Sequence, residues 1–419
     1  MTRLAPKLPS ILQKTEYDGE SKKSGPVSEL AVCEETIDSS LWRLHYREMD
    51  FSGSFISDLH GLSSLSGGAN LFFESEFQLA AQNRIMAPSP HQLYLTETLG
   101  EETSIRLYLP VNIEKAGFPP KPVLRAASHP YAPLSLPLVE QDDIEEISER
   151  FASLYSKLEE LNSIPLMLED FPYEEDVAGK LTDALSRHGF HLCITSKVER
   201  AVLNPIHDAE DPGEAFMQRN LNSKRRRQLK AQLRKLDELG TVEFEKATEL
   251  PDVLTRFEEF LLVEVRGWKG RRRTAIHAIK KAAAFARQAV GQLARQKRAA
   301  VYSMRLDGSS IASLIMLKSG TRYYPWKIAY DENYQVFAPG VQLLLHATSD
   351  MLRIPGFSFS DSQSPPGAVV DRLWTDRMNL GTLIVAPGSS GTRKINALQA
   401  AIDRKAAARR FAKRLLRRD

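Results

Sequence analysis

The segment 301–361 constrains the fold of this chain more than any other, because it combines two turn signals with a helix start. Asp307-Gly308 lies between alternating apolar residues and is a strong signal of a two-residue β-hairpin turn. Ser319-Gly320 marks a second turn, and the aromatic and β-branched residues around it suit a pleated surface. The segment therefore predicts an antiparallel meander with strands at 301–306, 311–318 and 323–330.

A helix is predicted to begin at Pro339, directly after the meander. Apolar residues recur there at helical spacing, and proline suits a helix start because its missing N–H would have no partner. The free N–H groups of a helix start attract anions. The sequence QVFAPG resembles the Gln/Arg-x-x-Gly-x-Gly/Ala loop with which GNAT acetyltransferases hold the pyrophosphate of coenzyme A, although alanine replaces the first glycine and proline lacks a donor. The resemblance assigns cofactor binding to Gln335, Ala338, Pro339, Gly340 and Val341.

Composition narrows the class of protein. The 419 residues suffice for two domains, each with its own core. No apolar run approaches the roughly 18 residues of a membrane span, and the N-terminus lacks the apolar core of a signal peptide, so a cytoplasmic protein is expected. The 9 histidines and the 2 cysteines, Cys33 and Cys193, show no ligand spacing, so no metal is predicted.

Basic residues are clustered, although the net charge is only +3. The clusters at 224–235, 266–273 and 404–419 can meet a phosphorylated small molecule, an anionic lipid or nucleic acid. Acidic residues nearly balance them elsewhere, which argues against a dedicated nucleic-acid binder. The first cluster belongs to a predicted helix, 213–239, whose basic face is either simply solvated or an electrostatic funnel for an anionic substrate.

The alternation of predicted elements indicates two similar domains between two terminal segments. Their boundaries are predicted at 1–28 (disordered), 29–212 (first domain), 213–388 (second domain) and 389–419 (basic helical tail). The second domain has the order β-α-α-β-β-β-α-β, which is that of the GNAT fold. The predicted class is therefore α/β (α+β), with two tandem GNAT-like domains whose mixed, mostly antiparallel sheets are flanked by helices. The first domain lacks a glycine-bearing loop before a helix in the right context, so it is expected to have no cofactor site of its own.

Several motifs resemble the CelD-type acetyltransferase family, whose members are associated with cellulose and exopolysaccharide biosynthesis in bacteria. They cover about residues 40–385 and are ANLFFE (69–74), PLSLPLV (133–139), NSKRRRQLKAQLRKLDELG (222–240), GWKG (267–270), TAI (274–276), AYDENY (329–334), APG (338–340), FSD (359–361) and Trp374. The resemblance implies N- or O-transfer of an acyl group, acetyl first of all, from acyl-coenzyme A. It also implies a small-molecule or saccharide acceptor and a polysaccharide synthase as partners.

Two other functions stay open at this point. The family is distantly similar to Fem-type aminoacyl transferases, which pair two GNAT-like domains, so the basic helix is alternatively a binding face for charged tRNA. The chain is alternatively a catalytically degenerate scaffold that binds a synthase, an interpretation that Ala338 and Pro339 favour. The sequence does not decide the acceptor or the acyl group.

Four residues are candidates for catalysis, because acyl transfer needs a base for the nucleophile and an acid for the leaving thiolate. Glu264 lies on the apolar face of a predicted helix, where it is either a general base or a helix end turned to water. Asp361 ends a strand and is either part of the site or a cap for the next segment. Tyr330 and Tyr334 flank the predicted anion-binding loop, and each is either an acid or a packing residue.

Three residues are assigned to substrate binding. Trp268 and Lys269 lie in the basic turn RGWKGRRR, where an aromatic ring beside a cation suits the adenosine end of coenzyme A or a sugar. A solvated turn anchored by one tryptophan explains the same two residues. Trp326, in the third strand of the meander, completes the set.

The tail offers a second binding surface. Ala407, Phe411, Leu415 and Leu416 can share one face of a helix, and basic residues crowd the rest. Such a helix either lies on the inner face of an anionic membrane, with about 1 kcal/mol from each basic residue, or docks on its own domain.

Overall fold

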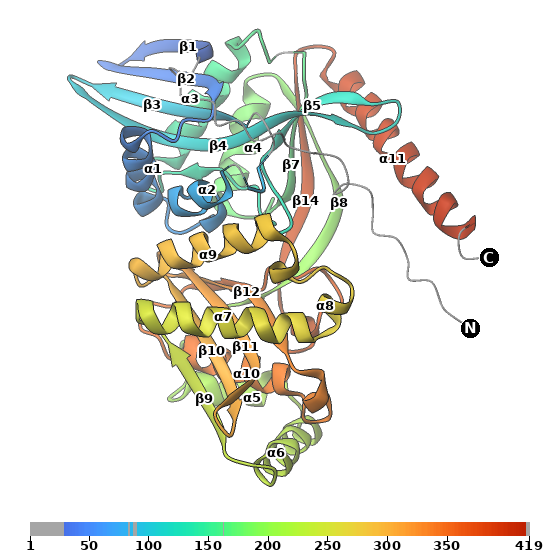
Figure 1. Cartoon of the computed structure of the whole chain (residues 1–419). Helices are drawn as coiled ribbons and strands as arrows, with labels where there is room; N and C mark the ends of the chain where they lie inside the picture. The colour runs from blue at the N-terminus through green and yellow to red at the C-terminus, as the bar shows by residue number, and fades with distance from the viewer. Residues whose placement is uncertain (1–28, 83, 87–89, 162, 416–419) are drawn as a thin grey trace.

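The structure, a computed structural model, describes residues 29–82, 84–86, 90–161 and 163–415 (Figure 1). The predicted disordered segment 1–28 lies outside these residues. Among the described helices, none combines the length and the apolar composition that crossing a membrane would take.

One continuous 14-stranded sheet runs through the whole molecule, in the order β1-β2-β3-β4-β5-β7-β14-β8-β13-β12-β11-β10-β9, with β6 paired to β4. The pairs β5–β7 and β12–β13 are parallel and the others are antiparallel, which confirms the predicted class, although one sheet replaces two. The strands are β1 (Glu29–Ile37), β2 (Ser40–Glu48), β3 (His91–Leu99), β4 (Glu102–Ala116), β5 (Lys121–Ala126), β6 (Leu138–Val139), β7 (Leu166–Phe171), β8 (Phe190–Leu203), β9 (Val242–Ala247), β10 (Ala299–Leu306), β11 (Ser309–Ser319), β12 (Arg322–Tyr330), β13 (Phe359–Asp361) and β14 (Asp376–Pro387).

Helices cover both faces of this sheet. On the meander β10–β12, Val301 and Ile315 pack toward α7 and α9, whereas Tyr302 and Leu314 pack toward α10 on the opposite face. The helices are α1 (Gly53–Leu65), η2 (Leu71–Phe73), α2 (Ser75–Ala81), α3 (Ile144–Lys157), α4 (Asp176–Arg187), α5 (Pro212–Asn220), α6 (Ser223–Asp237), α7 (Leu250–Arg266), α8 (Trp268–Arg271), η3 (Ile276–Ala278), α9 (Lys280–Arg295), η4 (Glu332–Phe337), α10 (Pro339–Leu352), η5 (Val369–Arg372) and α11 (Gly391–Leu415).

Two halves of the chain repeat one order of elements, which fits tandem GNAT-like units. The first half (29–203) contains β2, α1, α2, β3, β4, β5, α3 and β7 in sequence. The second half (242–361) contains β9, α7, α9, β10, β11, β12, α10 and β13 in the same sequence. In both, the third meander strand pairs in parallel with the strand that follows the next helix.

The late strand β14 returns to the first half. It lies between β7 and β8 and pairs with both, while the end of β8 pairs with β13 of the second half (Figure 1). The first part of α11 then packs on β8 and β14 through Ile395 and Leu398. The boundary between the domains 29–212 and 213–388 stays a prediction, and β14, from the end of the second range, is built into the sheet of the first.

A buried polar seam joins the two halves and consists of Glu74 and Glu76 from the first half with Gln296, Arg298 and Ser319 from the second. Glu74 accepts hydrogen bonds from Arg298 and from the Ser319 hydroxyl, and Glu76 accepts one from Gln296 at 2.7 Å. A Cβ at Gly68 would lie 2.1 Å from the carbonyl oxygen of Ser319, and the φ of this glycine is +72°, so the close approach of the halves requires glycine there.

Local turn signals located most elements well and two helices wrongly. The meander and the helix start at Pro339 are confirmed. The single predicted helix 213–239 is wrong, because the side chain of Asn222 accepts a hydrogen bond from Arg225 N at 2.8 Å and starts a second helix. The sequence also favours a helix over 274–295 with Thr274 as its N-cap, and this start is wrong, because α9 begins only at Lys280, after the turn η3.

Candidate active site

The start of α10, at the end of the meander, leaves the backbone N–H of Gly340 without a backbone acceptor among the described residues, while Ala338 N donates to the carbonyl oxygen of Gln335 at 3.0 Å. Ala338 has a left-handed conformation with φ 53°, and its carbonyl accepts hydrogen bonds from the N–H groups of Val341 and Gln342, both at 3.0 Å. No described side chain caps this helix start, and its first turn contains no acidic residue. A Cβ at Gly340 would lie 3.2 Å from the Tyr330 ring, so the chain packs closely here. The arrangement suits a phosphate group, which takes N–H donors and the positive end of the helix dipole.

The loop before α10 is tied to the basic turn at Trp268. Glu332, the first residue of η4, accepts a hydrogen bond from Trp268 N at 2.6 Å and pairs with Arg271 at 2.6 Å. Gln335 is exposed in this loop, and Tyr334 is half-buried against the apolar cluster under α10. Trp268 is 44% exposed, with the Arg272 guanidinium 5.2 Å from its ring centre. The structure therefore brings the predicted cofactor loop and the predicted substrate turn together.

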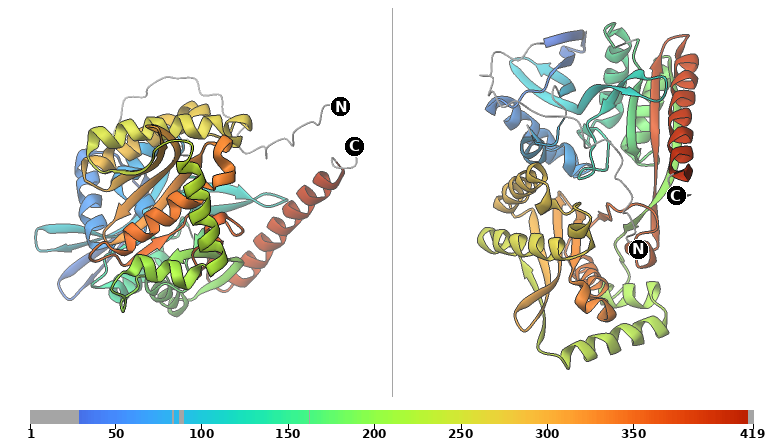
Figure 2. Two further views of the ribbon diagram at one scale, coloured as in Figure 1. Left: turned by 90° about the horizontal axis from the view of Figure 1, so that it is seen from below. Right: turned by 45° about the vertical axis from the view of Figure 1, so that its right-hand side comes forward.

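The basic helix α6 is fixed beside the same loop. Gln232 of α6 donates to the carbonyl oxygen of Val336 at 2.7 Å, and Gln342 of α10 donates to that of Leu229 at 2.8 Å. Leu229 and Leu236 are its buried residues, and Figure 2 shows α6 at the end of the molecule far from the first half. Its exposed basic residues are Lys224, Arg227, Lys230, Arg234 and Lys235.

Glu264 and Lys269 form a buried ion pair next to β12. Glu264 is 3% exposed; its Oε1 accepts from Lys269 Nζ at 2.9 Å and its Oε2 from Ile276 N at 2.7 Å. Lys269 Nζ also lies 3.5 Å from the carbonyl oxygen of Ile328. Both carboxylate oxygens of Glu264 are thus engaged, so this residue holds α8 and η3 against the strand.

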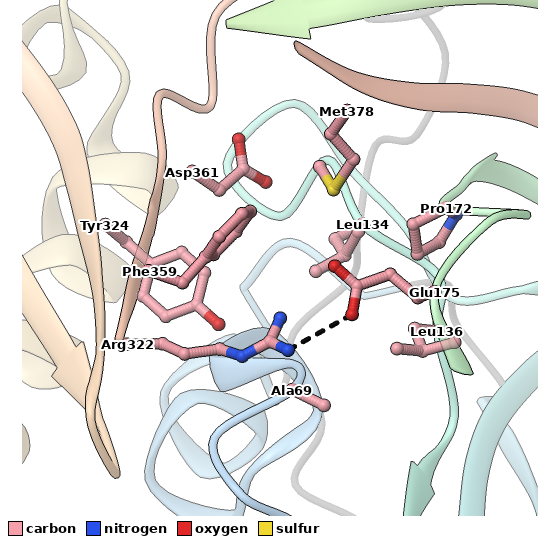
Figure 3. A pocket seen from close by; sticks show the side chains of 10 residues that line it. All are labelled: Ala69, Leu134, Leu136, Pro172, Glu175, Arg322, Tyr324, Phe359, Asp361 and Met378. Atoms are coloured by element: carbon pink, nitrogen blue, oxygen red, sulfur yellow. Dashed lines mark hydrogen bonds and ion pairs between the residues drawn. The ribbon is translucent and has the colours of Figure 1, made fainter. Parts of the chain in front are cut away.

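The outer edge of β12 is open over most of its length. β13 pairs with β12 only at Arg322 and Tyr323, and Trp326 is an extra residue opposite β11, as in a β-bulge. A small cavity between the halves begins beside the paired end, and Figure 3 shows Arg322 in it, bonded to Glu175 at 3.1 Å. An open strand edge of this kind offers N–H and C=O groups to an extended ligand.

Asp361 lines that cavity (Figure 3), and Glu264 is not among the lining residues. It is 1% exposed and accepts hydrogen bonds from Arg200 at 3.2 Å, from Gln363 N at 2.9 Å and from the Gln363 side chain. These contacts join β13 to β8. The structure thus places the two predicted catalytic carboxylates in separate environments, each with its own cationic partner.

Three residues near Trp326 were not anticipated from the sequence: His129, Tyr131 and Lys327. Trp326 is buried and donates from Nε1 to the carbonyl oxygen of Tyr131 at 2.9 Å, and Lys327 Nζ lies 5.1 Å from the centre of the Tyr131 ring. A lysine inside the apolar strand sequence YYPWKIAY was the available signal for Lys327. His129 and Tyr131 belong to the first half, so no local pattern could place them here.

The second half of the chain contains a GNAT acetyltransferase domain, so the protein is an acyltransferase of the GNAT type. Residues 223–359 match the family described as acetyltransferase (GNAT) domain. The GNAT fold implies acyl-coenzyme A as co-substrate, and the positive start of α10, which has no side-chain cap, suits its phosphates. In the part of the chain that the structure describes, no group of side chains could hold a metal ion.

Several solved structures are similar to this chain at low sequence identity. The chain is similar to FemX, with a TM-score of 0.50, 8% identity and coverage of 83% of this chain and 99% of that one. A conserved protein of unknown function from Bacteroides thetaiotaomicron VPI-5482 gives a TM-score of 0.48, 9% identity and coverage of 81% and 99%. A tandem GNAT protein from the clavulanic acid biosynthesis pathway gives a TM-score of 0.39 at 12% identity, with coverage of 82% of this chain and 98% of that one. No curated protein sequence matches the chain.

Proposed function

We propose that this protein transfers an acyl group, acetyl first of all, from acyl-coenzyme A to an amine or hydroxyl of a small-molecule or saccharide acceptor. One observation carries the proposal: the start of α10 has no side-chain cap and no acidic residue in its first turn, and the basic helix α6 packs next to it. The pyrophosphate would be held at the start of α10 by the backbone N–H of Gly340 and by the positive end of the helix dipole. The acyl end would extend along the open edge of β12.

The chemistry assigns complementary tasks to the residues around this edge. Tyr330, the last residue of β12, or Tyr334, in the loop that follows, would protonate the leaving thiolate. Glu264 acts through Lys269, because its two oxygens are engaged and it fixes the ammonium next to the strand. Trp268 offers an exposed ring for the adenosine or for a sugar.

Binding of acetyl-coenzyme A, compared with binding of S-acetylpantetheine, tests the proposal. The two ligands share the thioester arm, but only acetyl-coenzyme A carries the phosphates. At about 100 times its dissociation constant, acetyl-coenzyme A should stabilise the chain by about 2.7 kcal/mol and raise the melting temperature, whereas S-acetylpantetheine should bind at least tenfold more weakly. Equal affinities would contradict a phosphate site at α10.

The acceptor is assigned on sequence resemblance. The CelD-type motifs favour an acceptor in cellulose or exopolysaccharide assembly, with a polysaccharide synthase as partner. The exposed end of α11, where Phe411 is 65% exposed, is then a surface for the inner face of the membrane. Leu416 of the predicted apolar face lies outside the described residues. Pelleting of the full chain, but not of a chain ending at residue 401, with anionic vesicles at low salt would support this part.

Aminoacyl transfer from charged tRNA is a second candidate. The similarity to FemX covers 99% of that structure, and the exposed cations of α6 suit a phosphate backbone as well as coenzyme A. Binding of tRNA that weakens steeply with salt, without any affinity for acetyl-coenzyme A, would favour this candidate over the first.

A further inference from the structure

Lys327 stands out because it is a lysine without a carboxylate partner at the junction of the two halves. Its Nζ lies over the ring of Tyr131 at 5.1 Å and over that of Trp326 at 5.7 Å. Among the described residues it makes no hydrogen bond and no ion pair that would hold it as an ammonium. Glu264, the carboxylate that interacts with it electrostatically, is already engaged by Lys269 and by Ile276 N.

The surroundings favour the neutral amine of this lysine. Burial lowers the pKa of Lys327 to about 8, and the Lys269 ammonium on α8 acts in the same direction, while Glu264 on α7 opposes them. The remaining groups that face it come from the connection between β5 and β6. Tyr131 is one of them, and burial, together with Glu264, raises its pKa, so it stays a neutral phenol.

The fourth neighbour, His129, is also neutral. Its Nδ1 accepts a hydrogen bond from Tyr131 N at 3.3 Å, its ring stacks on Phe77, and Phe285 meets it edge-on. Burial, and then Lys327, lower the pKa of His129 to about 3. Because Nδ1 is occupied and the ring is enclosed by aromatic side chains, His129 is not available to take a proton from a substrate.

Lys327 also lies at the right place along β12. It follows the bulged residue Trp326, on the stretch of the strand whose outer edge has no partner strand, and it precedes by three residues Tyr330, whose ring touches Gly340. Three residues of strand span about 10 Å. Lys327 thus lies about 10 Å along the strand from the residue that packs at the start of α10, in the direction proposed for the thioester.

We propose that Lys327 is the general base of the acyl transfer, an inference that rests on the function proposed above. The neutral amine takes the proton of the acceptor N–H or O–H while the acceptor atom forms a bond with the thioester carbon. The carbon–sulfur bond breaks, and the thiolate leaves. The ammonium then returns the proton to the thiolate, directly or through a tyrosine, so the products are the acylated acceptor and free coenzyme A.

Competitive labelling of the full chain with fluorodinitrobenzene tests this without a known acceptor. Lys327 should be labelled with an inflection near pH 8, and saturating acetyl-coenzyme A should slow its labelling at least tenfold. Lys318 of β11, which lies over the Tyr323 ring at 5.7 Å, is the matched control and should show neither property. Labelling of Lys327 that acetyl-coenzyme A does not slow would overturn the inference.

Kinetics on variants provide the second test, with thiol release from acetyl-coenzyme A measured from pH 6 to 9.5 with water, methylamine and glycerol as acceptors. In the wild type the rate should rise with pH and level off above about pH 8, as the amine loses its proton. Lys327→Arg and Lys327→Met should lose about 10²- to 10⁴-fold in kcat and lose the inflection, while acetyl-coenzyme A binding changes less than threefold. Lys318→Met should leave the profile unchanged.

The outcomes separate the two proposals. A wild type that binds no acetyl-coenzyme A contradicts the proposed function, whatever Lys327 does. A wild type that binds it and releases thiol, together with a Lys327→Arg variant that keeps rate and inflection, contradicts the inference alone. Binding without release to any of the three acceptors also counts against Lys327 as a base. Recovery of activity in Lys327→Cys after aminoethylation, which restores an amine at this position, would support it.

Discussion

Each half of the molecule has a helix at the same place in the fold, α3 in the first half and α10 in the second. The first turn of α3 contains acidic residues, and that of α10 contains none. α3 and α10 each follow the third strand of a meander and precede a strand that pairs in parallel with it, β7 with β5 and β13 with β12. At α10 the first three helical residues are Pro339, Gly340 and Val341. At α3 they are Ile144, Glu145 and Glu146, after Asp143.

This difference explains why one scaffold offers a phosphate site once rather than twice. A helix start favours a negative charge, and at α3 the chain supplies that charge itself. Asp143 is in addition paired with Arg106 at 2.6 Å. At α10 no acidic side chain occupies the first turn, so the positive end of the helix is left for a ligand. Repetition of a fold therefore does not imply repetition of its binding site.

The largest effect is expected when the acid of α3 is placed at α10. In Gly340→Glu the carboxylate takes the position that Glu145 has in α3, and a like charge about 4 Å from a phosphate costs about 4 kcal/mol near a protein surface, so binding should weaken at least 100-fold. Gly340→Gln has nearly the same shape without the charge and should lose much less. Titration calorimetry measures the affinity of each variant for acetyl-coenzyme A. If the two variants lost the same affinity, packing against Tyr330 and not the charge would be the cause.

The second effect concerns the seam that holds the two halves together. Burial raises the pKa of Glu74 from 4.5 to about 7, against the opposing effects of Arg298 and Ser319. The folded state thus holds this proton more tightly than the unfolded state, so the stabilisation is complete below pH 4.5 and is lost as the pH rises through 7, by about 3 kcal/mol. Urea unfolding at several pH values should show this slope in the wild type and not in Glu74→Gln. Parallel curves would refute the assignment.

A smaller effect is expected from the charges of α6. Replacing Arg227, Lys230 and Arg234 by glutamine should weaken acetyl-coenzyme A binding about tenfold and flatten its salt dependence, because these side chains are exposed beside the α10 loop. Arg226 is left in place because it donates to the carbonyl oxygens that end α5.

The matched control removes the same charge from α11, with Lys405, Arg409 and Arg410 replaced by glutamine. These residues are exposed on α11. Binding should be unchanged in this variant. If the α11 variant lost as much affinity for acetyl-coenzyme A as the α6 variant, the loss would be due to the net charge of the chain and not to a contact of α6 with the ligand.

The last prediction is that the first half binds no acetyl-coenzyme A. Saturating titration of the wild type should give one molecule of acetyl-coenzyme A per chain, because the acidic start of α3 repels phosphates. Two molecules per chain would remove the contrast between the halves. Glu145→Gln combined with Glu146→Gln shows whether a second, weak site appears once the acids are neutral.

The sequence predicted what local chemistry determines. The turns at Asp307-Gly308 and Ser319-Gly320 and the start at Pro339 depend on a few neighbouring residues, and the structure has all three. The ion pair of Glu264 with Lys269 is also a local feature that sequence could predict, because the two residues are five positions apart at a helix end. The break at Asn222 was missed because the residues on both sides continue a helical pattern.

The rest of the site depends on contacts between distant parts of the chain. Tyr131 meets Trp326 and Lys327 across 195 positions, and this contact exists only because the two halves share one sheet. Asp361 is likewise held away from Glu264 by a distant partner, because Asp361 accepts a hydrogen bond from Arg200 on β8. Neither arrangement leaves a periodic pattern or a turn signal in the sequence.

The position of β14 between β7 and β8 has a consequence for the synthesis of this protein. The ribosome completes β7 and β8 long before it adds β14, so the sheet of the first half stays interrupted while the whole second half is translated. During that time the edges of β7 and β8 expose backbone groups that invite wrong pairing. We therefore expect the nascent chain to rely on chaperones, and the insertion of β14 to be the event that locks both halves together.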